Sequence, residues 1–164
     1  MRRSTYTGLL GTALLAVLAL AACGQGASGS PGGSGGSSAT TVIHVHAMTV
    51  GGKSVSALTN VQGLTLYYLT KDTTSSATCS GSCAKTWPPL LLPSGSPGSD
   101  TSLSGTLTFL DSANGRQVVY NGYPLYTYSG DSKPGDANGN GYGGIWFVAT
   151  SDLAFNTNGS GGGY

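Results

Sequence analysis

The chain has 164 residues, of which 8% are charged, and 7 Lys and Arg against 6 Asp and Glu give a formal net charge of +1. This length fits one domain with a modest core. So few basic residues leave no stripe that could neutralise phosphates, so we do not expect nucleic acid as a partner. The 28 glycines favour turns and strands over a helical core.

The N-terminal segment has the pattern of a bacterial lipoprotein signal peptide. Arg2 and Arg3 precede an apolar run over 9–22, which is shorter than the roughly 20 apolar residues that span a bilayer. The LAAC stretch that ends at Cys23 resembles the lipoprotein box, in which the cysteine thiol is alkylated with a diacylglycerol. We expect residues 1–22 to be removed and Cys23 to be lipidated. The alternative is an ordinary secretory signal cleaved elsewhere.

A polar tether is expected next. Residues 24–40 read GQGASGSPGGSGGSSAT and contain nothing large to bury, so residues 23–40 are predicted to be a lipidated cysteine followed by a flexible linker. Two or more acyl chains give lasting attachment, which predicts a membrane-anchored protein on the extracytoplasmic side. The Gly-rich end, 156–164, is expected to be a disordered tail.

Residues 41–155 are predicted to form one small all-β domain. Short runs rich in Val, Thr, Tyr, Phe and Trp alternate with turn residues. The predicted strands are 41–50, 64–70, 106–110, 116–120, 123–128 and 145–150. Asn121 and Gly122 predict a two-residue hairpin turn, because both of its central positions need positive φ. Asn114 and Gly115 predict a second tight turn, and 79–87 has room for one helical turn.

One pattern occurs twice in the predicted domain. GLTLYYLTKD ends at Asp72, GYPLYTYSGD ends 59 positions later at Asp131, and a tryptophan follows each aspartate by 15 residues, Trp87 and Trp146. Neither unit is large enough to bury a hydrophobic face alone. We therefore expect two related units, about 52–92 and 106–150, to pair into an antiparallel domain with pseudo-twofold character.

The repeat resembles the bacterial "secreted repeat of unknown function" lipoprotein family, whose members carry a YxFxxD-type motif. Tyr126, Tyr128 and Asp131 match the motif fully, whereas Tyr67 and Asp72 match it with a leucine in place of the central aromatic residue. The CSGSCAKTWPPL and PGDANGNGYGGIW segments resemble the two loops of the family. The resemblance implies a cell-envelope lipoprotein and leaves its activity open.

Two cysteines remain after the lipoprotein box. Cys79 and Cys83 are spaced CxxxC in an exported chain, which favours a structural disulfide. A redox pair is the alternative, although the spacing differs from CxxC and no helix N-terminus is evident to lower a thiol pKa.

His44, His46 and Met48 form an HxHxM pattern. On a strand all three side chains project from the same face, and imidazoles next to a thioether favour copper. The alternative is a solvent-exposed strand face without a metal. We therefore expect no cofactor, with copper as the one candidate.

The remaining candidate sites favour structural roles. Asp72 and Asp131 are expected to cap turns by accepting backbone N–H bonds, and catalytic carboxylates are the alternative. The DANGNG stretch from Asp136 matches the opening of a calcium loop but lacks the closing glutamate, so we expect a glycine-rich turn.

The sequence therefore predicts a non-catalytic binding module of the envelope. No hydrolase, phosphate-loop or dinucleotide fingerprint occurs in the chain. Its expected partners are the membrane, through the lipid anchor, and an unidentified protein or small-molecule ligand. A copper-binding or redox lipoprotein is the alternative.

Overall fold

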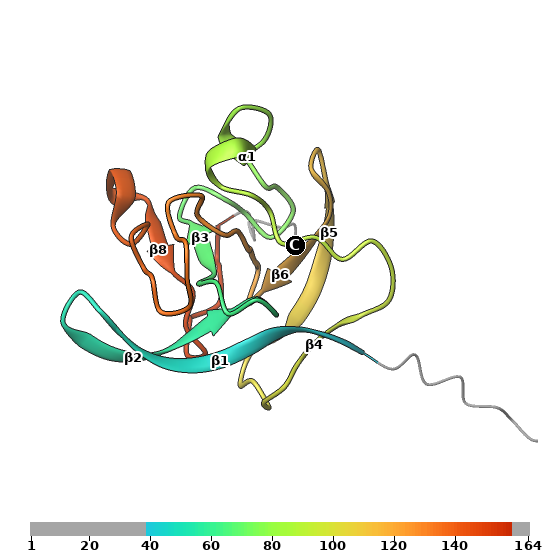
Figure 1. The fold of residues 1–164 in the computed structure, drawn as a ribbon. Coiled ribbons are helices and arrows are strands. Elements are labelled where there is room, and N and C mark those ends of the chain that lie inside the picture. The colour runs from blue at the N-terminus through green and yellow to red at the C-terminus, as the bar shows by residue number, and fades with distance from the viewer. Residues whose placement is uncertain (1–38, 159–164) are drawn as a thin grey trace, which may run out of the picture. The chain divides into compact units, whose positions relative to one another are not determined.

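The computed structural model describes residues 39–158. The predicted signal peptide, Cys23 and most of the linker lie outside these residues. No helix within 39–158 is long and apolar enough to cross a membrane. The elements in chain order are β1 (Thr40–Val50), β2 (Lys53–Thr59), β3 (Tyr67–Leu69), α1 (Cys83–Thr86), β4 (Pro97–Ser99), β5 (Leu107–Ser112), β6 (Gly115–Tyr120), β7 (Tyr123–Pro124), the 3-10 turn η1 (Tyr142–Gly144) and β8 (Trp146–Val148) (Figure 1).

The strands form three small sheets, with orders β2-β1-β4, β3-β8 and β5-β6-β7. Neighbours pair antiparallel, except that β1 and β4 run parallel. In Figure 1 the β1–β2 hairpin runs below β3 and β8, and the β5–β6 hairpin stands beside them. The prediction of a small all-β domain with antiparallel pairing is confirmed.

The long β1 strand was predicted, but its hairpin partner β2 was not. The tip residues Gly51 and Gly52 both have positive φ, 56° and 80°, which reverses the chain and pairs Val50 with Lys53. In β2 the pattern KSVSALT places serines among the apolar residues, so its strand signal is weak. Pairing with β1 and burial of Ala57 and Leu58 hold it extended.

Both predicted tight turns occur. Asn121 is the one non-glycine residue with positive φ (46°) in the described chain, and Gly122 follows with φ 80° between β6 and β7. A Cβ on Gly122 would lie 2.8 Å from Cγ2 of Thr74, so space as well as φ requires glycine there. Ser112 pairs with Gly115 across the second turn. The strand predicted over 123–128 is wrong in extent, because β7 ends at Pro124.

The two repeat units are related by a pseudo-twofold arrangement. Tyr67 and Tyr126 lie at its centre and exchange both backbone hydrogen bonds, at 2.8 and 3.0 Å. Tyr67 also pairs with Val148 of the second unit, and Tyr126 pairs with Pro89 of the first. The two pairs are equivalent contacts with the units exchanged: Tyr126 lies 59 positions after Tyr67, and Val148 lies 59 positions after Pro89. The helical turns α1 and η1 also begin 59 positions apart. The predicted pairing of related units is therefore confirmed.

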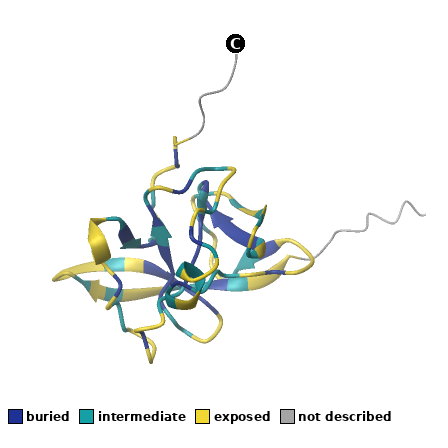
Figure 2. Ribbon diagram, turned by 90° about the horizontal axis from the view of Figure 1, so that it is seen from above, coloured by how far each residue is buried: buried dark blue, intermediate teal, exposed yellow. Residues whose placement is uncertain are grey.

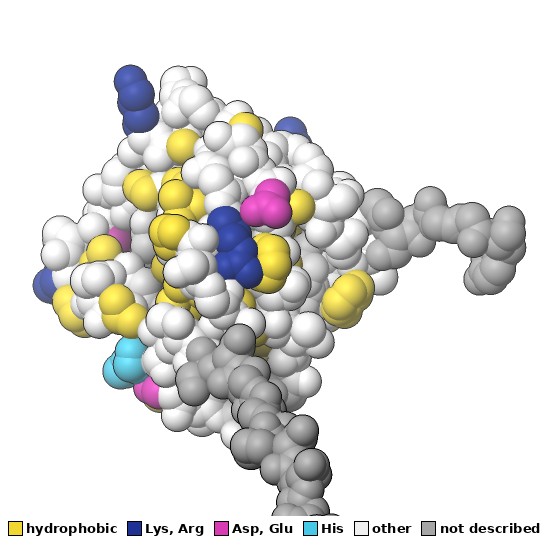
Figure 3. Space-filling model, turned by 90° about the vertical axis from the view of Figure 1, so that its right-hand side faces the viewer, with side chains coloured by type: hydrophobic (Ala, Val, Ile, Leu, Met, Phe, Trp, Pro, Cys, Tyr) yellow, Lys and Arg dark blue, Asp and Glu magenta, His cyan; other side chains and the backbone are white. Residues whose placement is uncertain are grey.

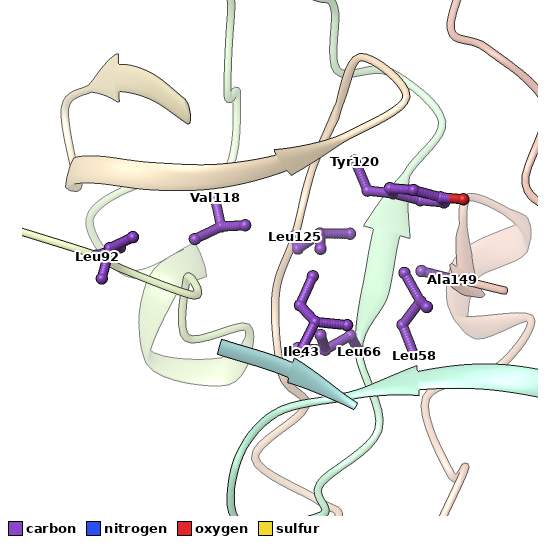
Figure 4. Packing of buried hydrophobic residues seen from close by; sticks show 8 residues of the cluster. All are labelled: Ile43, Leu58, Leu66, Leu92, Val118, Tyr120, Leu125 and Ala149. Atoms are coloured by element: carbon purple, nitrogen blue, oxygen red, sulfur yellow. The ribbon is translucent and has the colours of Figure 1, made fainter. Parts of the chain in front are cut away.

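The core consists of two clusters of buried side chains. The first joins β1 and β2 to β6, and its members are Ile43, Leu58, Leu66, Leu92, Val118, Tyr120, Leu125 and Ala149 (Figure 4). The second lies between the repeat units and contains Ala57, Tyr67, Leu69, Cys79, Trp87, Tyr126, Trp146 and Val148. Buried strand residues gather at the end of β2 and in β3, β6 and β8, whereas the tip of the β1–β2 hairpin and most turns are exposed (Figure 2).

The folded part extends beyond its predicted end at residue 155. Asn156 is fully buried, and its side-chain Nδ2 donates to the carbonyl oxygens of Asp72 (3.0 Å) and Gly122 (3.1 Å). Asn158 Nδ2 donates to the carbonyl oxygen of Thr70. The predicted start of the tail at residue 156 is therefore too early, because asparagine side chains rather than apolar ones fasten this segment. Residues 159–164 lie outside the described range.

Candidate functional site

The repeat motif residues meet in a reciprocal crossing between the two units. Tyr67 of the first unit donates its hydroxyl to Oδ2 of Asp131 in the second, at 2.6 Å. Tyr126 of the second unit donates to Oδ2 of Asp72 in the first, at 2.7 Å. The hydroxyl of Tyr67 and that of Tyr126 therefore each donate to the motif aspartate of the other unit.

The second oxygen of each aspartate caps a turn in its own unit. Oδ1 of Asp72 accepts the backbone N–H of Thr78 at 2.8 Å and its hydroxyl at 2.7 Å. Oδ1 of Asp131 accepts the backbone N–H of Asn138 at 3.0 Å. The sequence pointed to this capping role but not to the tyrosine partners, which are more than 50 positions away.

Burial sets the protonation of these groups. Desolvation raises the pKa of the Asp72 carboxyl, and the hydrogen bonds from Thr78 and Tyr126 oppose that shift. Desolvation, together with the neighbouring carboxylates, raises the pKa of the Tyr67 and Tyr126 hydroxyls far above the ordinary tyrosine value. The tyrosines therefore remain neutral donors, and neither reaches solvent to act as a base or nucleophile.

Stacked aromatic rings accompany the crossing. The indoles of Trp87 and Trp146 stack at 3.9 Å between centroids with 3° between their planes. Tyr128 packs at 4.5 Å from Trp87. Tyr142 also contacts Trp87 and is 52% exposed, whereas both tryptophans are buried. The motif aromatic residues therefore mainly form core.

Cys79 and Cys83 form a disulfide, with Cα atoms 5.3 Å apart, as predicted. Cys79 is buried, and its carbonyl oxygen accepts a 2.8 Å hydrogen bond from Nδ2 of Asn114. The bond closes the loop that leads into α1, and the turn at the matching place in the second unit has no cysteine.

His44, His46 and Met48 line one pocket of about 500 Å³. The other walls are the end of β2 at Thr59, the turn 60–63, and Pro134 with Gly135 from the second unit. The structure therefore brings the HxHxM side chains together on one concave surface, as strand alternation predicts.

The turn that closes this pocket has its own supports. Oδ1 of Asn60 accepts the backbone N–H groups of Gln62 (3.0 Å) and Leu64 (2.9 Å), which fixes the turn. Gly63 has φ 80°, and a Cβ there would lie 3.0 Å from Cγ of Pro134. Glycine at this position lets the two units approach across the pocket.

Asp100 is a residue of this site that the sequence did not reveal. Its Oδ2 lies 2.6 Å from Nδ1 of His44, 56 positions away. The parallel pairing of β1 with β4 brings Asp100 there, and its backbone N–H donates to the carbonyl oxygen of Ile43 at 3.1 Å. The hydrogen bond to His44 lowers the pKa of the Asp100 carboxyl. Figure 3 shows histidine beside an acidic side chain on the exposed surface.

The calcium-like stretch is held by internal hydrogen bonds. Asp136 accepts hydrogen bonds from Ser132 and from Lys133, whose Nζ lies 2.9 Å away. The Lys133 hydrogen bond is the main cause that lowers the pKa of Asp136 to about 2. Oδ1 of Asn140 accepts the backbone N–H of Val148. These oxygens fix a turn, as the sequence favours.

Two segments of the chain, residues 48–91 and 108–150, match the family described as a secreted repeat of unknown function, and together they cover more than half of the 164 residues. The chain belongs to this family of secreted repeats. The resemblance inferred from YTYSGD and YYLTKD is thereby confirmed, and the membership places the chain among secreted proteins. Comparison with curated proteins and with solved structures gives no match.

The family segments separate the two candidate sites. The Tyr–Asp crossing and the tryptophan stack lie wholly inside the matched secreted repeats. His44 and His46 lie before the first repeat, which begins at Met48. The crossing therefore lies within the two matched segments, whereas the histidine pocket combines residues of those segments with the part of β1 that precedes residue 48.

Proposed function

We propose that this secreted repeat protein is a lipoprotein of the cell envelope, anchored through Cys23, that acts as a non-catalytic binding module. The lipoprotein box and the polar tether support the anchor. The family's secreted character agrees with an extracytoplasmic location. The module's partners are the membrane and a ligand that binds the described domain.

The observation that carries the binding role is how the polar groups are distributed. The motif carboxylates and tyrosine hydroxyls that could perform chemistry are buried and bonded to each other. The pocket beside β1, in contrast, is open, and its lining includes imidazole, thioether, amide and hydroxyl groups beside the apolar side chains of Ala47, Val61 and Pro134. Groups of this kind recognise a ligand without general acid–base machinery.

The cysteine pair gives less support to a redox protein. Cys79 is buried, so an external thiolate could approach only the half-buried Cys83. The helix that begins at Cys83 has four residues, too few for the N-terminal field that activates thiols.

The anchor is tested by growing bacteria that express the full chain with a radiolabelled fatty acid. We expect label on the wild type and none on Cys23→Ala, whereas Cys79→Ser should retain it because that cysteine is not modified. Absence of label on the wild type would overturn the anchor.

The non-catalytic role is tested separately on the full chain purified in detergent. We expect the protein to hydrolyse ester, phosphate, peptide and glycoside reporter substrates no faster than buffer alone does. Turnover that persists through purification, and is lost in Asp72→Asn protein shown to be folded by circular dichroism, would contradict a binding module and point to a hydrolase.

A further inference from the structure

We propose that His44, His46 and Met48 form a copper(I) site in the pocket beside β1. The inference names the ligand class of the module proposed above and rests on that function. Four observations carry it: the placement of the side chains, the free sulfur of Met48, the carboxylate behind His44, and an unpartnered hydroxyl in the pocket wall.

The strand places the three side chains for one ion. His44, His46 and Met48 alternate along β1 and all line the pocket. The two imidazole centroids lie 6.3 Å apart. A metal bound through ring nitrogens at about 2 Å holds two ring centres about 5–6 Å apart. The two rings are therefore spaced closely enough for one ion to bind both, once the His46 side chain turns toward it.

The sulfur of Met48 has lone pairs to give. The hydroxyl of Thr65 lies 3.8 Å from the sulfur. That hydroxyl has a single proton, which it donates to the carbonyl oxygen of Asp136 at 2.6 Å. The thioether therefore accepts no competing hydrogen bond, and it is a soft donor on a residue that lines the pocket.

Asp100 prepares His44 as a ligand. Imidazoles that bind metals commonly donate their other ring N–H to a carboxylate, which fixes the tautomer and orients the ring. The 2.6 Å contact between Nδ1 of His44 and Asp100 has this form and leaves Nε2 free. Asp100 does not line the pocket and acts through His44, so it is a positioning residue rather than a ligand, and its backbone bond to Ile43 holds it in place.

The hydroxyl of Thr59 is an independent indication that an exogenous group binds in the pocket. It is 2% exposed, and its Oγ1 has no hydrogen-bond partner in the described structure. Thr59 lines the pocket and pairs across the sheet with His44, so both side chains project from the same face. Leaving a buried hydroxyl unpaired is unfavourable, and an exogenous group bound beside the copper ion would satisfy it.

The donor set favours copper(I) over harder ions. Thioether sulfur is a soft ligand, and two imidazoles with one thioether suit copper, whereas calcium and magnesium prefer oxygen. Among residues 39–158, no lysine or arginine lines the pocket to oppose a cation. Three protein ligands leave one position for the exogenous group beside Thr59.

The test uses the full chain purified from membranes in detergent. Copper(I) is titrated anaerobically with ascorbate against a chromophoric copper(I) chelator, and copper(II) and zinc are titrated in parallel. We expect one copper(I) per chain and a loss of affinity of at least about tenfold in His46→Ala and in the volume-conserving Met48→Leu. X-ray absorption should show copper–nitrogen and copper–sulfur scattering, the latter lost in Met48→Leu.

The positioning role of Asp100 has its own variants. Asp100→Ala should weaken copper(I) binding about 10- to 100-fold. Asp100→Asn should restore part of the affinity, because its amide oxygen still accepts from Nδ1 of His44. Equal affinity in both variants and the wild type would contradict this role.

Matched controls separate the site from other copper ligands. Thr49→Ala, on the opposite face of β1, and the double variant Cys79→Ser with Cys83→Ser should keep the wild-type affinity. Near-ultraviolet circular dichroism checks that each variant is folded. Absence of copper binding by the folded wild type, or binding unchanged in both His46→Ala and Met48→Leu, overturns the proposal. The fatty-acid label on Cys23 and the substrate assays are read independently, so failure of the copper site leaves the anchored module standing.

Discussion

The hydroxyl of Tyr126 lies 2.7 Å from Oδ2 of Asp72, a residue 54 positions earlier in the other repeat unit, and both side chains are fully buried. The equivalent hydrogen bond joins the hydroxyl of Tyr67 to Asp131. Because each carboxylate receives its hydroxyl from the opposite unit, the crossing ties stability to the pairing of the two units.

Removing either hydroxyl should destabilise the domain. Tyr126→Phe leaves a buried carboxylate oxygen without its donor, which costs about 1–3 kcal/mol of unfolding free energy. Tyr67→Phe should cost a similar amount: Asp131 is 8% exposed, but the backbone N–H of buried Gly139 also loses the Tyr67 hydroxyl that accepts it at 3.3 Å. Urea unfolding monitored by circular dichroism measures both values. Tyr142→Phe is the matched control, since its ring lies 52% exposed, and an equal loss there would refute the argument.

Stability should fall in alkali because of the same residues. The pKa values of Tyr67 and Tyr126 are raised in the folded state, so the folded protein keeps protons that the unfolded chain releases above about pH 10. Their contribution is present below that pH and is lost as pH rises further. Tyrosinate absorbance from the two residues should appear together with unfolding. The double variant Tyr67→Phe with Tyr126→Phe should show a flatter alkaline profile.

The disulfide should contribute modestly. Cys79 and Cys83 close a very small ring, for which the chain-entropy estimate is about 2 kcal/mol. The double serine variant should therefore lose about that amount and still fold, as measured by chemical denaturation under oxidising conditions. Complete loss of structure in the double serine variant would contradict this prediction, because it would show that the domain cannot fold without the disulfide.

Gly139 should be intolerant of any side chain. Its Cβ would lie 2.8 Å from Cη2 of Trp87 and 3.0 Å from Cε1 of Tyr67, inside the packed aromatic cluster. We expect Gly139→Ala to cost about 1–3 kcal/mol and to change tryptophan fluorescence. Gly135→Ala is the control for the fluorescence change. A Cβ there meets no neighbour, so its cost of about 1–2 kcal/mol comes from the backbone, at φ 88°, and the tryptophan fluorescence should stay unchanged.

The local parts of the fold were predictable from the sequence. The turn preference of Asn121 and Gly122 depends only on neighbouring residues, and so does the alternation of side chains along β1. Both features occur in the structure. The repeat spacing also predicted paired units. By contrast, β4 spans Pro97–Ser99, whose composition does not favour a strand, and only its pairing with β1 makes it one.

The site was predictable in part for the same reason. Strand alternation was sufficient to bring His44, His46 and Met48 to one surface. Asp100 was missed because nothing near it in the sequence marks a histidine partner, and its position depends on the pairing of β4 with β1. The unpartnered hydroxyl of Thr59 results from tertiary packing, so it cannot be predicted from the neighbouring sequence.

The reciprocal Tyr–Asp bonds also give the chain a route to a domain-swapped dimer. Each half supplies the acceptor that the other half lacks, and a second copy of the chain supplies the same acceptor equally well. Residues 92–107 connect the matched repeats, so their length sets whether the halves meet within one chain. Shortening this connection should favour a dimer with the same buried hydrogen bonds, which light scattering would detect as twice the mass of one chain.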